Sequence, residues 1–136
     1  MVIRDASEQD LAAIAGIQAA APEASQWNPG DYLLYDCRVA DDGEVAGFAV
    51  ARRVAEGEWE ILNLAVAPEK RRRSAGRRLL SDMLARHPGV FFLEVRESNA
   101  AAVRFYEVMG FRAVTKRFQY YADPVEAAIV MKLLSC

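Results

Sequence analysis

The chain has 136 residues, a length that fits one domain able to bury roughly 68–70% of its unfolded surface. Its composition, 53% hydrophobic and 26% charged, is typical of a globular protein, and no apolar run approaches the roughly 18–20 residues of a membrane span. Two cysteines and one histidine offer almost nothing for a disulfide framework or a zinc site. We therefore expect a single domain over residues 1–136, located in the cytoplasm, without a metal and without a membrane partner.

The charges are unevenly distributed along the chain. The net charge of −2 argues against a general nucleic-acid binder. Basic residues are nevertheless concentrated in one short segment, which contains Lys70, Arg71, Arg72, Arg73, Arg77 and Arg78. A patch of this kind is either a solvated helix face or a binding site for an anion.

The first half of the chain predicts a helix followed by an antiparallel meander. Ser7, with Asp10 and then apolar residues at helical spacing, marks the start of the helix. Asp42-Gly43 is a hairpin signal between two apolar runs. Alternation and turn residues predict strands at 2–4, 37–40, 45–50 and 59–66, a turn-rich segment at 22–31 around Trp27, and a short helix near 32–34.

The second half predicts a crossover and a closing strand pair. A helix over 75–86 separates the strand ending at Val66 from a strand at 90–95, and such a crossover makes the two strands parallel. The remaining predicted elements are a helix capped by Ser98 and ended by Gly110, and strands at 111–121 and 128–134. The fold class is therefore mixed α/β, with a mostly antiparallel central sheet of about seven strands, one parallel pair and about four flanking helices.

The basic patch lies where the first strand of the crossover turns into its helix. The free N–H groups of a helix start point at such a turn, and the helix dipole favours an anion there. Gly76 permits close approach of the backbone. This position favours a phosphate site over a solvated face.

The same segment carries a family resemblance. Leu-Asn-Leu-Ala-Val-Ala-Pro at 62–68 and Arg-Arg-Arg-Ser-Ala-Gly-Arg-Arg-Leu-Leu at 71–80 resemble the acetyl-CoA motif of the GNAT acetyltransferases. One position departs, because Ser74 stands where a glycine is usual, and a positive φ there would cost a serine about 1 kcal/mol or more. The resemblance implies acetyl-CoA as cosubstrate, bound by Leu64, Ala65, Val66, Arg71, Arg72, Arg73, Ser74, Ala75, Gly76, Arg77, Asn99 and Tyr106.

The downstream half resembles one type within that family. Residues 93–102, 105–111 and 120–131 look like those of the RimI-type alanine N-acetyltransferases. That resemblance implies Glu94 as general base, Tyr106 as general acid, and the N-terminal alanine of a small-subunit ribosomal protein as acceptor. Transfer would be direct, within a ternary complex. We expect a monomer or a weak dimer.

The chemistry suits these residue types. A protein α-amine has a pKa of about 7.7–8.0, so it must lose a proton before it attacks a thioester. A carboxylate can take that proton, the Val66 N–H can donate to the developing oxyanion, and a tyrosine can protonate the departing thiolate.

Alternatives remain at each position. Glu94 could be a surface carboxylate, with Glu60 in the partner strand as a second candidate base, and Tyr106 could belong to the core. The candidates for holding the acceptor N-terminus are Trp27, Tyr120, Tyr121 and Glu126. The alternative functions are acetylation of a lysine side chain or a small amine, a non-catalytic CoA-binding module, and a nucleic-acid role for the arginine patch.

Overall fold

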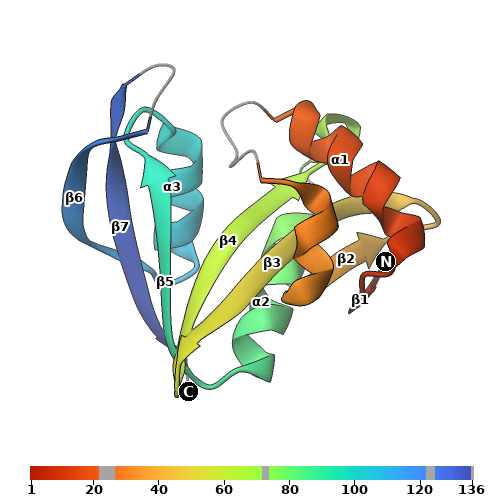
Figure 1. Cartoon of the computed structure of the whole chain (residues 1–136), viewed down its shortest axis with the longest axis horizontal. Coiled ribbons are helices and arrows are strands. Elements are labelled where there is room, and N and C mark those ends of the chain that lie inside the picture. The colour runs from red at the N-terminus through yellow and green to blue at the C-terminus, as the bar shows by residue number, and fades with distance from the viewer. Residues whose placement is uncertain (22–26, 72–73, 122–124, 136) are drawn as a thin grey trace.

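A computed structural model describes residues 1–21, 27–71, 74–121 and 125–135 (Figure 1). Its strands form one sheet in the order β1-β2-β3-β4-β5-β7-β6. The strands are β1 (Val2–Asp5), β2 (Asp36–Asp41), β3 (Val45–Ala55), β4 (Glu58–Val66), β5 (Gly89–Arg96), β6 (Arg112–Tyr121) and β7 (Glu126–Ser135). The α-helices are α1 (Leu11–Ala19), α2 (Ala75–Arg86) and α3 (Ala100–Val108), and the 3-10 helices are η1 (Glu8–Asp10), η2 (Pro29–Leu34) and η3 (Pro68–Lys70). The predicted fold class is confirmed, with η2 as the short helix expected near residues 32–34.

The parallel pair is short and its strands then diverge. Only Glu58–Glu60 of β4 pair with β5, and their partners are Val90–Phe92. The next residues of β4 carry a bulge on the side of β3: Ile61 faces Ala51 and Asn63 faces Val50, which leaves Leu62 without an opposite residue. A bulge of this kind bends and twists its strand. In Figure 1 the two strands accordingly separate toward their carboxyl ends.

Two apolar cores lie on opposite faces of the sheet. Leu79, Leu80 and Met83 of α2 pack with Phe91 and Leu93 of β5. On the other face, the side chains from α1 and η2 that pack on β2, β3 and β4 include Ile14, Ile17 and Tyr32. Alternation along β5 supplies Phe91, Leu93 and Val95 to the first core, as the sequence pattern predicted.

The helix boundaries confirm one predicted cap and correct another. The Ser7 N–H donates to Asp10 Oδ2 at 2.8 Å, which completes the predicted capping box. The predicted Ser98 cap is wrong, because Asn99 is the N-cap of α3 and its Oδ1 accepts from the Ala102 N–H at 3.1 Å. Asparagine caps helices as well as serine does, and the Ser98 N–H instead donates to Glu126 at 2.5 Å.

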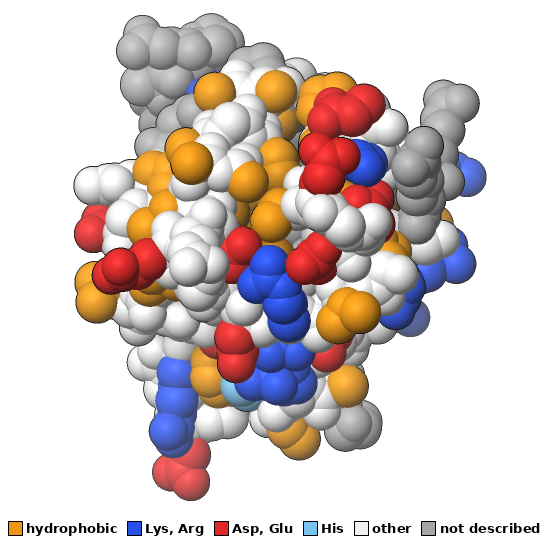
Figure 2. Space-filling model, turned by 90° about the vertical axis from the view of Figure 1, so that its right-hand side faces the viewer, with side chains coloured by type: hydrophobic (Ala, Val, Ile, Leu, Met, Phe, Trp, Pro, Cys, Tyr) orange, Lys and Arg blue, Asp and Glu red, His pale blue; other side chains and the backbone are white. Residues whose placement is uncertain are grey.

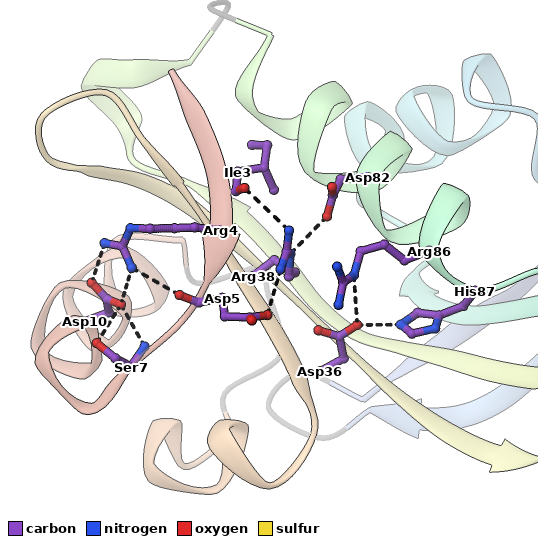
Figure 3. Close-up of polar contacts among 10 residues, drawn as sticks. All are labelled: Ile3, Arg4, Asp5, Ser7, Asp10, Asp36, Arg38, Asp82, Arg86 and His87. Carbon is purple, nitrogen blue, oxygen red and sulfur yellow. Dashed lines mark hydrogen bonds and ion pairs between the residues drawn. The ribbon is translucent and has the colours of Figure 1, made fainter.

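An ion-pair network joins the first two strands to α2 (Figure 3). Arg38, only 8% exposed, donates to Asp5 at 2.7 Å and to Asp82 at 3.0 Å. Asp36 bonds His87, the C-cap residue of α2, at 2.5 Å. Figure 2 shows this face, where acidic and basic side chains alternate around the single histidine. The network fixes one end of α2 against the sheet.

Within the described ranges, no helix is long and apolar enough to cross a bilayer. The same residues contain no group of three or more His, Cys, Asp or Glu side chains arranged to hold a metal ion.

Candidate active site

A cleft of about 610 Å³ opens where β4 and β5 diverge. Its volume is within the range of roughly 300–1,000 Å³ that is usual for small-molecule sites. It is lined mainly by residues 61–66 of β4, 93–96 of β5, 74–77 at the start of α2, and by Arg71, Asn99, Ala101, Ala102, Phe105, Tyr106 and Tyr121. The cleft therefore contains most of the residues predicted to bind the cosubstrate.

One end of the cleft is the start of α2. Ser74 is the N-cap residue, with φ +66° and ψ +10°, so it adopts the left-handed conformation that the motif's usual glycine would supply. The Arg78 N–H donates to the Ser74 carbonyl at 2.9 Å, and the amides before Arg78 are those that an α-helix leaves without an internal partner. Arg71 and Arg77 line the same end, whereas Arg72 and Arg73 lie outside the described residues.

The middle of the cleft is apolar and narrow. A Cβ added at Gly76 would lie 3.6–3.7 Å from Phe105, Val66 and Leu64, so these side chains pack around the glycine. The Leu64 N–H already donates to Asn63 Oδ1 at 3.0 Å. A ligand here would therefore meet the Leu64 side chain rather than its amide. The start of α2 and the apolar middle of the cleft together fit an extended molecule with an anionic terminus and an apolar arm.

The other end of the cleft holds Glu94. Its Oε1 accepts from Arg117 at 2.9 Å, while its Oε2 is buried and has no hydrogen-bond partner of ordinary geometry among the described residues. Hydrogen bonding to Glu94, followed by burial, raises the pKa of Tyr120 to about 12. A buried carboxylate oxygen without a partner is costly and is suited to receive a donor from a ligand or water.

Tyr106 belongs both to the core and to the cleft. It is 8% exposed and packs edge-on against Phe105 and Phe111, with ring centroids 5.2 and 5.6 Å apart. Burial, with a smaller contribution from Tyr121, raises the pKa of Tyr106 above its usual value. Its hydroxyl therefore stays protonated at neutral pH and is available as a proton donor.

Glu60 lies apart from the cleft. It belongs to the paired part of β4, where its carboxylate bonds Arg52 at 2.7 Å. It is not among the residues that line the cleft. Of the two candidate bases, the structure places Glu94 beside the cleft with Tyr106, and Glu60 outside it.

The four residues predicted to hold the acceptor are only partly brought together. Tyr121 lines the cleft, and burial raises its pKa to about 12. Tyr120, 43% exposed, lies beside Tyr121 with ring centroids 5.0 Å apart. Trp27 and Glu126 are not cleft residues, and the Glu126 carboxylate is occupied by the Ser98 N–H and by Arg96.

A buried polar cluster beside the cleft was not predicted from the sequence. Asn63 Nδ2 donates to Gln18 Oε1 and to the Tyr32 hydroxyl, each at 3.1 Å, and Tyr32 also bonds Gln18. Gln18 Nε2 in turn donates to the Trp27 carbonyl at 2.6 Å. The cluster ties the segment at Trp27 to β4. An asparagine within an otherwise apolar strand was the signal that could have revealed it.

Comparisons with known proteins agree with this architecture. The model of the acetyltransferase (GNAT) family matches residues 5–111. The ribosomal protein bS18-alanine N-acetyltransferase of Escherichia coli strain K12 is 38% identical over 112 residues, which cover 78% of this chain and 74% of that protein. The crystal structure of the Escherichia coli ribosomal-protein-S18-alanine N-acetyltransferase matches with a TM-score of 0.82 at 31% identity, over 98% of this chain and 93% of that one. Ard1 from Thermoplasma volcanium matches with a TM-score of 0.88 at 25% identity, over 99% and 97% of the two chains.

These matches define the class: the chain belongs to the GNAT acetyltransferase family. It is an acetyltransferase, and its cosubstrate is acetyl-CoA, the acetyl donor of that family. Within the family, its similarity is to the RimI-type alanine N-acetyltransferases, as its sequence motifs predicted.

Proposed function

We propose that this acetyltransferase modifies the α-amine of a protein N-terminus, and that its acceptor is the N-terminal alanine of a small-subunit ribosomal protein. The relatives that carry that activity in their names support the acceptor class. The site itself supports it through one observation: Glu94 Oε2 lies buried beside the cleft and, among the described residues, has no hydrogen-bond partner of ordinary geometry.

In this proposal, Glu94 is the general base. The acceptor arrives largely as an ammonium near neutral pH, since its pKa is about 7.7–8.0. The Glu94 carboxylate accepts a proton from it, directly or through one water, and frees the nitrogen lone pair to form the new amide bond. A positioned base of this kind typically contributes about 10²–10⁴-fold to the rate.

Tyr106 acts as the general acid. Acetyl-CoA, when bound, supplies the acetyl thioester whose C–S bond breaks. The leaving sulfur requires a proton, and Tyr106, which its raised pKa keeps protonated, can supply one from the wall of the cleft. The acetyl-CoA ligands in this proposal are residues 64–66, Arg71, residues 74–77 and Asn99, with Arg72 and Arg73 as further candidates.

We propose direct transfer from donor to acceptor, in a single domain formed by residues 1–136. Cys37 does not support a route through an acetylated cysteine, because it is buried outside the cleft. Burial is also the main cause that raises the pKa of its thiol to about 12. Its thiol is therefore protonated and unreactive at neutral pH.

Glu94→Gln is the decisive variant. We expect it to bind acetyl-CoA as the wild type does by calorimetry, and to lose at least about 10²-fold in turnover in a thiol-release assay. Near-wild-type turnover across a pH series would remove Glu94 from the role of base.

A peptide panel tests the acceptor. Peptides with the N-terminal sequences of ribosomal proteins are offered with free or blocked α-amines, and the products are located by mass spectrometry. We expect acetylation only at a free N-terminal alanine. Modification confined to lysine would contradict the α-amine assignment, and binding of acetyl-CoA without any release of CoA would indicate a non-catalytic module.

A further inference from the structure

The outer strand β6 carries an irregularity next to Glu94. Arg117 pairs with Ala128 of β7, and the next paired residue, Tyr121, faces Glu126, so residues 118–120 lie opposite Ala127 alone. Within this bulge Gln119 has φ +54°, a conformation that residues with a side chain rarely adopt. A bulge re-aims the side chains beside it.

Arg117, which precedes the bulge, and Tyr120, which lies within it, converge on the Glu94 carboxylate. Arg117 donates to Glu94 Oε1 at 2.9 Å, and its guanidinium carbon lies 4.4 Å from the centre of the Tyr120 ring. The Tyr120 hydroxyl also interacts with Glu94. The Arg117 side chain is 54% exposed, so it covers the carboxylate from the solvent side rather than from within the core.

Arg117 differs from the other charged groups around Glu94. On β5, Arg96 lies over the Tyr121 ring and bonds Glu126, and on β4, Glu60 is paired with Arg52. Among the residues that the structure describes, the remaining titratable groups that face this region are the hydroxyls of Tyr106, Tyr120 and Tyr121. Arg117 is therefore the cation in direct contact with Glu94 among the described residues.

We propose that Arg117 is a positioning residue that covers the Glu94 carboxylate in the free enzyme and leaves it when the acceptor ammonium arrives. This proposal rests on the role of Glu94 as base. An ammonium and a guanidinium are both cationic donors, so they compete for one carboxylate. Because Arg117 is half-exposed and is attached to a strained bulge of an edge strand, its departure breaks no core packing.

The proposal predicts that KM and kcat respond differently to the loss of Arg117. In Arg117→Gln, the acceptor ammonium no longer competes with a guanidinium for Glu94, so the KM of the acceptor peptide at neutral pH should fall severalfold. The value of kcat should stay that of the wild type, because Arg117 has already left Glu94 in the enzyme–substrate complex.

Two variants serve as controls. Lys116→Gln removes a positive charge from the neighbouring position, whose partner is Glu97 at 2.8 Å, and should leave both KM and kcat unchanged. Arg117→Lys retains a competing cation and should keep most of the wild-type KM. The affinity of each variant for acetyl-CoA, measured by calorimetry, should equal that of the wild type, since Arg117 does not line the cleft.

The outcomes separate this proposal from the proposed function. If the wild type releases no CoA with any N-terminal peptide, the proposed function itself fails. If the wild type turns over and Arg117→Gln has the same KM and kcat, only the role of Arg117 is overturned. A fall in kcat without a fall in KM also overturns it, because Arg117 would then act on Glu94 in the complex.

Discussion

Ser74 shows at the scale of one residue how a departure from a motif is accommodated. Its φ of +66° means that the loop before α2 keeps the left-handed geometry although a serine replaces the usual glycine. Such a conformation costs a residue with a Cβ about 1–2 kcal/mol. Glycine at this position would itself lose about 0.4–1 kcal/mol through the greater entropy of its unfolded chain. The strain at Ser74 therefore lowers the stability of the fold, while the left-handed geometry of the loop is already present.

We accordingly expect Ser74→Gly to raise the free energy of unfolding by about 0.5–1 kcal/mol. The dissociation constant for acetyl-CoA should change by less than about threefold, since the loop geometry does not change. Urea denaturation and calorimetry measure the two quantities. Ser74→Ala, which removes the hydroxyl and keeps the strain, is the matched control and should gain no stability. A large gain in affinity without a gain in stability would contradict this account.

At the scale of elements, the start of the first helical segment depends on one buried carboxylate. Asp10, 6% exposed, accepts from Arg4 at 2.8 and 2.9 Å as well as from Ser7. The hydrogen bonds from Arg4 are the largest of the contributions that lower the pKa of Asp10 to about 2. In the unfolded chain the value is about 3.9, so the ionised form is favoured by folding.

The lowered pKa gives a pH dependence of defined sign. A depressed folded-state pKa stabilises the protein above the unfolded value, and the contribution is lost as pH falls from about 4 toward about 2. We expect Asp10→Asn to cost about 1–2 kcal/mol at pH 7, and the difference from wild type to shrink by pH 3. Urea denaturation at both values measures it. The exposed Asp31→Asn should differ from wild type by less than about 0.5 kcal/mol at either pH.

The polar cluster under β4 is the second element-scale feature. Asn63, Gln18 and Tyr32 are 6%, 5% and 1% exposed, so their hydrogen bonds are shielded from water. We expect Asn63→Ala to cost about 2–3 kcal/mol, because the buried oxygens of Gln18 and Tyr32 lose the Asn63 donor and the Leu64 N–H loses its acceptor. Tyr32→Phe should cost about half as much. Since the cluster also holds the Trp27 carbonyl, Asn63→Ala should raise the KM of the acceptor peptide more than that of acetyl-CoA. Equal changes in the two KM values would indicate that this segment does not contact the acceptor.

These elements also show which parts of the structure a sequence can predict. The helix at 75–86 was predicted with its observed bounds, because a strong apolar stripe and a helix-start motif coincide there. The bulge at Leu62 was not predictable, since it depends on the register between β3 and β4 rather than on a local pattern. For the same reason, the contact between Arg117 and Glu94 could not be inferred, whereas Glu94 itself was identified by its motif.

At the scale of the whole molecule, the site exists because β4 and β5 are hydrogen-bonded at one end of the sheet and separate at the other. The predicted parallel pair is confirmed, but only its first residues are paired, and the cleft occupies the region where pairing has ended. Sequence patterning predicted the strands and their order of connection. It did not predict the divergence, which results from the bulge and from the packing of separate cores against the two faces of the sheet.

The end of the sheet where β4 and β5 are paired depends on Gly89. Its φ is +141°, and a Cβ there would lie 2.3 Å from the Gly57 carbonyl oxygen, which accepts from the Val90 N–H at 2.8 Å. The obstacle is backbone rather than a movable side chain, so a substitution must displace the junction between β4 and β5. We expect Gly89→Ala to cost at least about 3 kcal/mol and to weaken acetyl-CoA binding, because the strands that form the cleft lose their common anchor.

Gly16 provides the matched control for this last prediction. It lies within α1, and among the described residues an added Cβ would meet no atom within 4 Å beyond the backbone of the helix itself. Gly16→Ala should therefore stabilise the protein by about 0.5–1 kcal/mol through helix propensity, with no effect on acetyl-CoA binding. Urea denaturation followed by circular dichroism, with calorimetry for acetyl-CoA, compares the two variants directly. A Gly89→Ala protein as stable as the wild type would show that the joined end of the sheet tolerates displacement, and that the cleft is held open by its two cores alone.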